Sequence, residues 1–243
     1  MLVILGKLGV SGGLFKSFQY SGSTIREMSI GSRMVLTNMA IEAGATNGII
    51  EPDQKLLDYL RGRTSQSFEV TRGDPDAEYA QVIEFHTDEI KEPMVAAPPK
   101  PTNVVGVTEV EGKRIDQAFI GSCTNGRLED LMIAAKILKG RKVDKLTKVI
   151  IIPASQEVYR AAAEEGLLST FVEAGAMVCP PTCGPCMEAH MGILGPGEVC
   201  ISSANRNFQG RAGDVTAQIF LASPATVAAS ALTGKISDPR QYF

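Results

Sequence analysis

Hydrophobic and polar positions follow two patterns along this chain, and the change between them divides it into two blocks. In the first block, the apolar runs at residues 2–8 and 48–52 predict strands, and residues 80–90 alternate like a third strand. Residues 24–43 carry apolar side chains at helical spacing, and Gly44 is well placed to end that helix. Residues 53–63 predict another helix, with Asp53 as its N-cap.

The second block alternates strands and helices more regularly. Short apolar runs predict strands at residues 116–121, 148–155, 176–180, 198–203 and 218–223. Helical patterns lie between and after them at residues 126–139, 156–165, 167–173 and 224–234, and Asn125 is a candidate cap for the first. This order predicts an α/β fold in which mostly parallel sheets are covered by helices on both faces.

A proline-rich segment, EPMVAAPPKPTN, separates the two blocks. Its four prolines exclude a regular helix and favour an extended linker. We therefore predict two domains, residues 1–92 and residues 104–243, joined by a linker over residues 93–103.

Composition narrows the class of protein. The chain has 243 residues, of which 44% are hydrophobic and 21% charged, and a formal net charge of −3. A chain without excess positive charge offers no basic surface for nucleic acid, so we expect no nucleic-acid partner. Its longest apolar runs are too short to span a bilayer, and Lys7 interrupts the only stretch resembling a leader, so the sequence indicates a cytoplasmic protein with no membrane partner.

Three loops follow predicted strands and carry unusual polar residues: GSCTNGR, PTCGPC and ANRNFQGR. Ligands of open parallel sheets bind beyond the carboxyl ends of the strands, so these loops are predicted to meet at one edge. The residues that would gather there are Cys123, Cys183, Cys186, Asn205, Arg206 and Arg211.

The cysteines alone leave the kind of site open. In a reducing compartment they favour metal binding or catalysis over disulfides. Cys123, Cys183 and Cys186 with His190 would make a Cys₃His zinc site, and the three thiolates would equally suit an iron–sulfur cluster. A redox dithiol needs only the C-x-x-C. The two arginines favour a functional site, because guanidinium groups bind carboxylates or phosphates through two parallel hydrogen bonds.

Residues 119–131 and 179–211 resemble signatures of the aconitase superfamily. Within it they are most similar to archaeal-type large subunits of the two-subunit branch, which includes 3-isopropylmalate dehydratase and homoaconitase. Residues 6–53 are similar to the segment that precedes the linker in that branch. The resemblance implies two three-layer α/β/α domains of the aconitase iron–sulfur type.

The resemblance also implies roles for individual residues. Cys123, Cys183 and Cys186 match the ligands of a [4Fe-4S] cluster, whereas Cys179 and Cys200 match no ligand and are expected in the core. The residues matching those that bind substrate carboxylates are Asn205, Arg206 and Arg211. Asn38 and Glu42 match a pair that contacts the substrate hydroxyl and water, and their spacing would place them on one helix face.

The activity that the resemblance implies is a hydro-lyase that isomerises a 2- or 3-hydroxy acid by dehydration and rehydration. The substrate would be 3-isopropylmalate, in leucine biosynthesis, or homoaconitate, and a small subunit with a swivelling domain would be the partner. Family large subunits have an additional N-terminal domain, which nothing here matches, so we expect this chain to be a C-terminal part that is inactive alone. The competing hypothesis is a non-catalytic α/β domain stabilised by zinc.

Overall fold

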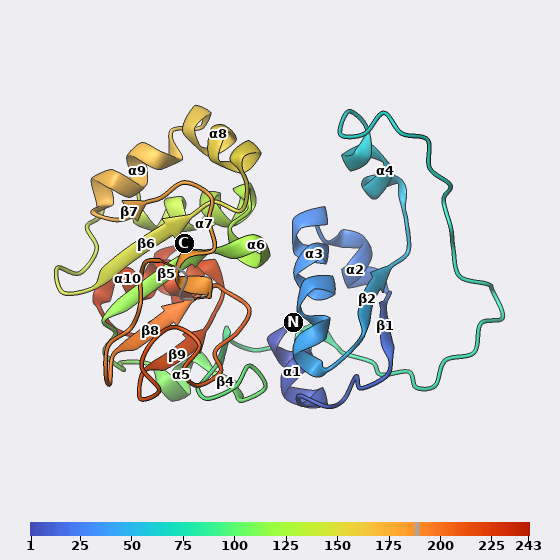
Figure 1. The fold of residues 1–243 in the computed structure, drawn as a ribbon, viewed down its shortest axis with the longest axis horizontal. Coiled ribbons are helices and arrows are strands. Elements are labelled where there is room, and N and C mark those ends of the chain that lie inside the picture. The colour runs from blue at the N-terminus through green and yellow to red at the C-terminus, as the bar shows by residue number, and fades with distance from the viewer. Residues whose placement is uncertain (188–189) are drawn as a thin grey trace.

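The computed structural model describes residues 1–187 and 190–243 and shows a mixed α/β fold with two sheets (Figure 1). The helices and strands, in chain order, are α1 (Leu2–Leu8), β1 (Ser17–Tyr20), α2 (Ser23–Glu27), α3 (Ile30–Asn38), β2 (Asn47–Ile50), α4 (Gln54–Leu60), β3 (Met94–Ala96), β4 (Val104–Gly106), α5 (Val107–Val110), β5 (Gln117–Gly121), α6 (Ser122–Asn125), α7 (Leu128–Leu138), β6 (Lys148–Ile152), α8 (Gln156–Glu164), α9 (Leu167–Ala174), β7 (Met177–Val178), β8 (Val199–Ser202), β9 (Gln218–Leu221) and α10 (Pro224–Thr233). Short 3₁₀ turns occupy Met39–Ala43, Thr87–Glu89, Gly184–Cys186 and Pro239–Tyr242.

The larger sheet has seven strands in the order β4-β3-β9-β8-β5-β6-β7. Its five strands β5 to β9 are parallel, and β3 and β4 are added antiparallel at one edge. All five strands predicted after residue 116 are present, as are α8, α9 and α10. Helix α7 begins at Leu128 rather than at residue 126, and Asn125, which we expected to cap it, instead donates from Nδ2 to the Ser203 carbonyl oxygen at 2.8 Å.

The direction of winding reverses between β5 and β8. From β5 the chain moves outward through β6 to β7, and it then returns to place β8 and β9 on the other side of β5. Crossovers between parallel strands are right-handed, so connections that run in opposite directions lie on opposite faces of the sheet. Helices α7, α9 and α10 cover one face. Against the other face lie described residues of the connections after β7 and β8, namely Cys186, Met191, Leu194, Ala204 and Ala212.

Within residues 1–187 and 190–243, irregular segments cover most of the second face, and helix α1 is the helix that packs there, so helices cover the two faces unequally. Alternate residues of β5 divide between two cores: Ala118 and Ile120 pack with the helices, and Phe119 packs with Leu194 and the irregular segments on the opposite face. Helix α1 adds Leu2 to this second core. The connection that follows β7 is rich in glycine and proline, which do not support helix interiors.

The N-terminal block differs from its prediction in two helical segments. Residues 2–8 form helix α1 rather than a strand, because the helix buries Leu5 against Met39 and Ala43. A short apolar run fits both structures, and tertiary packing decides between them. The long helix expected at residues 24–43 is divided into α2, α3 and a 3₁₀ turn, with Ser29 capping α3 by accepting a hydrogen bond from the Ser32 amide at 3.0 Å.

Other predictions in this block are confirmed. Gly44 ends the 3₁₀ turn in the left-handed conformation, with φ 80°. Asp53 caps α4 by accepting a hydrogen bond from the Leu56 amide at 3.0 Å. Strand β2 lies where an apolar run predicted it and pairs in parallel with β1 in a two-stranded sheet.

The segment between α4 and β3 is long and irregular and projects from the rest of the molecule (Figure 1). The strand predicted at residues 80–90 is wrong: only the 3₁₀ turn Thr87–Glu89 is regular there, and Val82 is 75% exposed. An alternating pattern makes a strand only where a neighbouring strand offers hydrogen bonds, and here a few side chains hold the segment instead. The Tyr79 hydroxyl donates to Gln19 Oε1 at 2.9 Å, and the Lys7 ammonium lies 4.8 Å from the Phe85 ring centre.

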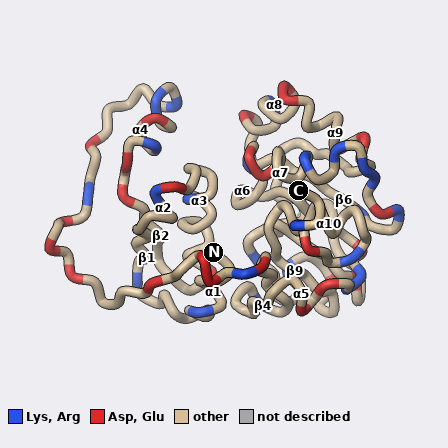
Figure 2. The backbone as a smooth tube through the Cα atoms, turned by 180° about the vertical axis from the view of Figure 1, so that it is seen from behind, with Lys and Arg blue, Asp and Glu red and all other residues tan. Residues whose placement is uncertain are grey.

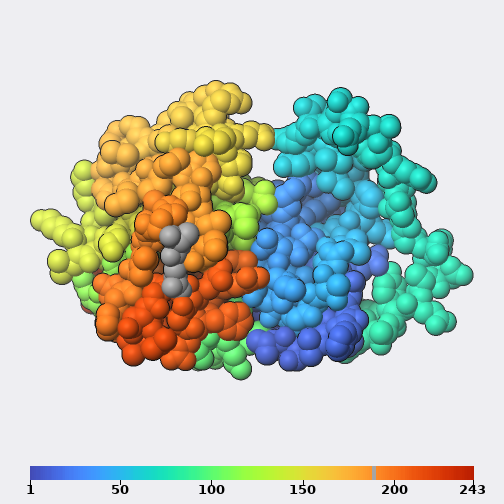
Figure 3. Space-filling view, in the orientation of Figure 1, coloured from blue at the N-terminus to red at the C-terminus, as the bar shows by residue number. Residues whose placement is uncertain are grey.

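The proline-rich segment is not a free spacer. Its residues 94–96 form β3, which pairs with β4 on one side and meets β9 on the other. The two blocks also touch directly, and Figure 3 shows N-terminal residues packed against the C-terminal part of the chain. Ser29 Oγ donates to Glu129 Oε1 at 2.7 Å, and Arg63 and Glu157 form an ion pair at 2.8 Å. The division into two domains stays a prediction.

Charged residues of both signs are interspersed along the backbone, without a large region of one sign (Figure 2). Across the described part of the chain, every helix is too short or too polar to cross a bilayer.

Candidate functional site

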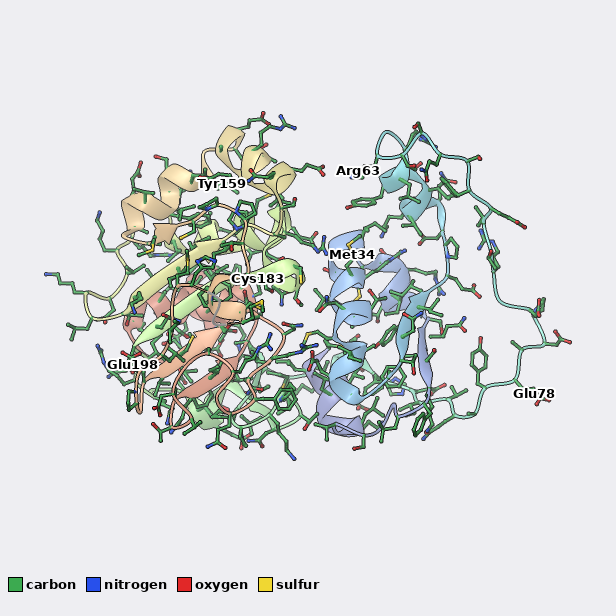
Figure 4. All side chains as sticks on the ribbon, viewed as in Figure 1. Met34, Arg63, Glu78, Tyr159, Cys183 and Glu198 are labelled. Carbon is green, nitrogen blue, oxygen red and sulfur yellow. The ribbon has the colours of Figure 1, made fainter. Side chains whose placement is uncertain are left out.

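The candidate site lies where the carboxyl ends of β5 and β8 meet, at the point where the winding direction reverses. The loop after β5 carries Cys123, and the loop after β8 carries Asn205 and Arg206. Cys183 follows β7 and lies on the side of the C-terminal region that is turned toward α3, the helix that carries Met34 (Figure 4). Such a reversal is where open α/β sheets bind their ligands, as the sequence predicted.

Cys123 is held in a one-turn helix, α6, that is pressed against the end of β6. Ser122, directly before it, has a φ of 78°, which is uncommon for any residue other than glycine. A Cβ atom at Gly126 would lie 2.7 Å from the carbonyl oxygen of Ile152, so only glycine fits that close approach. This backbone leaves the Cys123 side chain exposed at the rim of the sheet.

Cys183 and Cys186 lie in a tight turn in which the Cys186 amide donates to the Cys183 carbonyl oxygen at 2.9 Å. Burial raises the pKa of Cys186, the charge and hydrogen bond of Arg211 lower it, and the other two thiols raise it further. The charges of Cys123 and Cys183 thus act on Cys186. Within residues 1–187 and 190–243, no three His, Cys, Asp or Glu side chains are arranged as a ready-made set of metal ligands.

Two amide side chains link the cysteines of different loops. Asn38 Nδ2 donates to Cys123 Sγ at 3.9 Å, and Cys186 Sγ donates to Asn205 Oδ1 at 3.7 Å. Asn205 Nδ2 in turn donates to Asn38 Oδ1 at 3.4 Å, and Thr124 Oγ1 donates to the same oxygen at 3.0 Å. The N-terminal block thus contributes Asn38 directly to the rim that carries the thiols.

Glu42 and Arg206 form a second link between the blocks. Arg206 Nε donates to Glu42 Oε1 at 2.6 Å, and the Glu42 side chain is only 3% exposed. Burial raises the pKa of Glu42, and the hydrogen bond and charge of Arg206 oppose that shift. Because Glu42 is buried, it fixes the orientation of the half-exposed guanidinium.

Arg211 is anchored in the same way, since its Nε donates to the Cys186 carbonyl oxygen at 2.9 Å. Gly210 precedes it with φ 74°, a conformation that glycine adopts without strain and that turns Arg211 back toward the cysteine loop. Both arginines line an open cavity of about 450 Å³ together with Glu42 and the apolar residues Val10, Ile41 and Phe208. Within residues 1–187 and 190–243, each guanidinium is bound through Nε, and its terminal nitrogens could bind an anion in the cavity.

Asn38 and Glu42 reach the site by a different geometry from the predicted one. They do not share a face of one α-helix, because α3 ends at Asn38 and Glu42 lies in the following 3₁₀ turn. The structure still brings both side chains to the rim, Asn38 beside the thiols and Glu42 beside Arg206.

Several positioning residues were not found from the sequence. Ser203 is fully buried and accepts a hydrogen bond from the Gly121 amide at 3.0 Å, which ties the ends of β5 and β8 together. Asn207 is also buried and donates to the carbonyl oxygens of Ala96 and Ile219. Arg127 donates from Nη2 to the Cys123 carbonyl oxygen at 3.1 Å. The sequence does carry one signal that could have identified these residues, which is a cluster of polar residues directly after an apolar strand.

The remaining cysteines and His190 have other surroundings. Cys179 and Cys200 are buried, and burial raises the pKa of Cys200 to about 12, so it is a poor metal ligand at neutral pH. His190 Nε2 lies 2.7 Å from Thr182 Oγ1, with which it shares a hydrogen bond. This contact does not favour the Cys₃His zinc set.

The three remaining thiols suit an iron–sulfur cluster. They are soft ligands on two loops at one sheet edge, are exposed or half-buried, and form no disulfide. Asn38 Nδ2, which donates to Cys123 Sγ, can make the same hydrogen bond to a thiolate.

Comparisons with known proteins agree over nearly the whole chain. Residues 1–234 match the model of the aconitase family (aconitate hydratase). The 3-isopropylmalate dehydratase large subunit of Sulfurihydrogenibium sp. is 51% identical over 239 residues, which is 98% of this chain and 55% of that protein. The probable methanogen homoaconitase large subunit of Methanothermobacter thermautotrophicus is 49% identical over 241 residues, 99% of this chain and 56% of that protein. The chain therefore spans a little over half the length of these curated relatives.

Proposed function

Because this chain belongs to the aconitase family, we propose that it is part of the large subunit of a hydro-lyase that isomerises a hydroxy acid by dehydration and rehydration. The substrate that we propose first is 3-isopropylmalate, since relatives at 51% identity are large subunits of 3-isopropylmalate dehydratase. The enzyme would then act in leucine biosynthesis, in the cytoplasm.

We propose that Cys123, Cys183 and Cys186 hold a [4Fe-4S] cluster. Three protein ligands for four irons leave one iron without a protein ligand. When bound, such a cluster supplies Lewis acidity toward a substrate hydroxyl. The observation that carries the proposal is the convergence of three loops, distant in sequence, that bring these thiols and two anchored arginines to one sheet edge.

The other residues of the site would bind and orient the substrate. The terminal nitrogens of Arg206 and Arg211 would bind its carboxylates, with Asn205 beside them, and the two charges would stabilise the negative charge that develops on a carboxylate. Asn38 and Glu42 would contact the hydroxyl and water. The raised pKa of Glu42 suits a group that exchanges a proton with a hydroxyl, and its burial holds it at the cavity wall.

Homoaconitate is the second candidate substrate, because a probable homoaconitase large subunit is nearly as similar, at 49% identity. The carboxylate-binding groups proposed here serve both substrates alike. The zinc-stabilised domain is less well supported, since His190 shares its hydrogen bond with Thr182.

The relatives are large subunits, so we propose a small subunit as partner, and a swivelling domain in it that completes the site. We also propose that residues 1–92 complete a second three-layer domain in the longer protein, because a two-stranded parallel sheet is small for an independent domain.

Anaerobic reconstitution with iron and sulfide tests the cluster. We expect about four irons per chain and a brown chromophore, as a cubane held by three thiolates requires. Cys123→Ser, Cys183→Ser and Cys186→Ser should each abolish iron binding, because each removes one ligand. Cys179→Ala and Cys200→Ala are matched controls that should retain it. Equal loss of iron in the Cys200→Ala protein, or a colourless protein with one zinc per chain, would refute the ligand assignment.

A further inference from the structure

Gln117, the first residue of β5, is a buried polar side chain that the proposed chemistry does not use. It is 1% exposed. Because side chains alternate along a strand, it lies on the same face as Phe119, beneath the irregular connection that carries Cys183 and Cys186. Burying an amide removes its hydrogen bonds to water, so a buried amide has to make contacts of its own.

The Gln117 amide makes its contacts through its nitrogen. Nε2 donates to the Gly192 carbonyl oxygen at 3.0 Å and to Cys200 Sγ at 3.7 Å. In the part of the chain that the structure describes, Oε1 of the same amide is buried without a hydrogen-bond partner. An apolar side chain would avoid the cost of that oxygen. What the amide provides at this position is therefore a donor to the connection above it.

Gly192, the residue that Gln117 holds, rests on the turn with two of the thiols. A Cβ atom at Gly192 would lie 2.5 Å from Pro185 Cγ, and Pro185 is buried between Cys183 and Cys186. The φ of Gly192 is 65°, which glycine adopts without strain. A group that fixes the Gly192 backbone therefore limits how far the turn beneath it can move.

The third thiol belongs to the same strand as Gln117. Strand β5 begins with Gln117 and ends at Gly121, two residues before Cys123. One strand thus carries Cys123 beyond its carboxyl end and, from its first residue, holds the connection that carries the other two thiols.

We propose that Gln117 is a positioning residue for the proposed cluster ligands. Its hydrogen bond to Gly192 keeps the turn of residues 183–186 in the position from which its two thiols bind one cluster together with Cys123. The inference rests on the proposed function in taking these three thiols as the ligands. Loss of a group that orients metal ligands without touching the metal typically costs about 10–100-fold in metal affinity.

Gln117→Met tests the proposal, because methionine is a flexible side chain of similar length without an N–H donor. In the metal-free chain, hydrogen exchange should become about tenfold faster at the amides of Cys186 and Leu194, which donate to the carbonyl oxygens of Cys183 and Ala212. After anaerobic reconstitution with iron and sulfide, release of iron to a chelator should be about tenfold faster. The electron paramagnetic resonance spectrum of the reduced cluster should change, since it reports ligand geometry. The urea midpoint should change little, because the buried Oε1 is removed together with the donor.

Gly192→Ala disturbs the same contact from the other side, by placing a Cβ atom against Pro185. It should reproduce the faster exchange and the faster iron release, and the double variant should be no worse than either single one, because both act through one contact.

Ser230→Ala is the matched control. It removes a buried hydroxyl that donates to the Thr226 carbonyl oxygen at 2.7 Å within α10, on the helix-covered face of the sheet. The urea midpoint should therefore fall, while exchange at Cys186 and the rate of iron release stay unchanged.

Two results would overturn the proposal. One is unchanged exchange and iron release in the Gln117→Met protein. The other is iron release that follows the urea midpoint alike in the Gln117→Met and Ser230→Ala proteins, which would make Gln117 a residue of general stability. Failure of the proposed function gives a different result: the unsubstituted chain would take up no iron, while faster exchange at Cys186 in the Gln117→Met protein would still show that Gln117 holds the turn.

Discussion

The N-terminal block, residues 1–92, and the C-terminal region, residues 94–243, differ in how their parts of the site are held. The C-terminal region places its cysteines and arginines around a seven-stranded sheet with a hydrophobic core on each face. The N-terminal block has a two-stranded sheet and a small core around Leu5, Met39 and Ala43. Its contributions, Asn38 and Glu42, are fixed by contacts across the boundary. The cysteines and arginines are therefore held by the sheet and cores of the C-terminal region itself. The positions of Asn38 and Glu42 depend on how the N-terminal block packs against that region.

The largest expected effect concerns activity. The reconstituted chain should show no detectable turnover of 3-isopropylmalate, homoaconitate or citrate, even with a small subunit added. This chain spans 55% of the length of the 3-isopropylmalate dehydratase large subunit that it matches, and each transition-state contact that the rest of such a protein would supply is worth roughly 10²–10³ in rate. An anaerobic assay of the absorbance of the unsaturated acid formed by dehydration checks this, and activity should return when the chain is extended to the full length of its relatives. Measurable isomerisation by these 243 residues alone would mean that the catalytic groups are assigned wrongly.

The second prediction compares the two cores directly. Phe171→Ala, in the helix layer of the large sheet, should lower the free energy of unfolding by about 3–5 kcal/mol and destabilise the C-terminal region. Leu5→Ala should lower the free energy of unfolding by about 2–5 kcal/mol, mainly through packing lost in the smaller core. Hydrogen exchange should show lost protection at residues 1–50 in the Leu5→Ala protein and retained protection at residues 117–152. Equal loss in both regions would show that the two blocks unfold as one unit.

The third prediction uses Asp130, a partly buried carboxyl in the first turn of α7. Burial, with the charge of Glu129, raises the pKa of Asp130 to about 6, against the hydrogen bond from the Arg127 amide. The folded protein therefore holds a proton that the unfolded chain, with the ordinary value of 3.8, has released. The free energy of unfolding should fall by about 1–3 kcal/mol as pH rises from about 4 to about 6.

Urea unfolding across that pH range measures the effect. Asp130→Asn should remove this part of the pH dependence, because it cannot titrate. Asp74→Asn, an exposed carboxyl on the irregular segment, is the control. An unchanged pH profile in the Asp130→Asn protein would contradict the prediction.

The smallest expected effect concerns Arg211. Replacing it with Lys retains the charge but loses the planar pair of donors, so dicarboxylate binding should weaken about tenfold. Calorimetric titration with a hydroxy dicarboxylate measures the affinity, and Arg141→Lys, remote from the cavity, is the matched control. Unchanged affinity in the Arg211→Lys protein would indicate that this arginine does not contact the substrate.

The sequence predicted the C-terminal region better than the N-terminal block for a physical reason. Strands such as β5 and β6 are buried on both faces, and their continuous apolar runs reveal them. Residues 2–8 and 80–90 have apolar patterns that fit more than one secondary structure, and the segments packed beside them decide which one forms. The sequence predicted that the cysteines and arginines lie near one another, because parallel strands end at a common edge of the sheet. The bonds of Asn38 and Glu42 could not be predicted, because they depend on how one block docks against the other.

The reversal of winding between β5 and β8 sets the order of events during synthesis and folding. Cys123 leaves the end of β5, but Cys183 and Cys186 come far later, and Asn205 and Arg206 follow only after the chain has returned past β5 to form β8. Parallel pairing between distant segments is slow, because the loops must close before the contacts form. The three thiols therefore come together only late, once most of the sheet exists. If these thiols hold the proposed cluster, iron delivered to the nascent chain would meet isolated cysteines, and loading would follow folding.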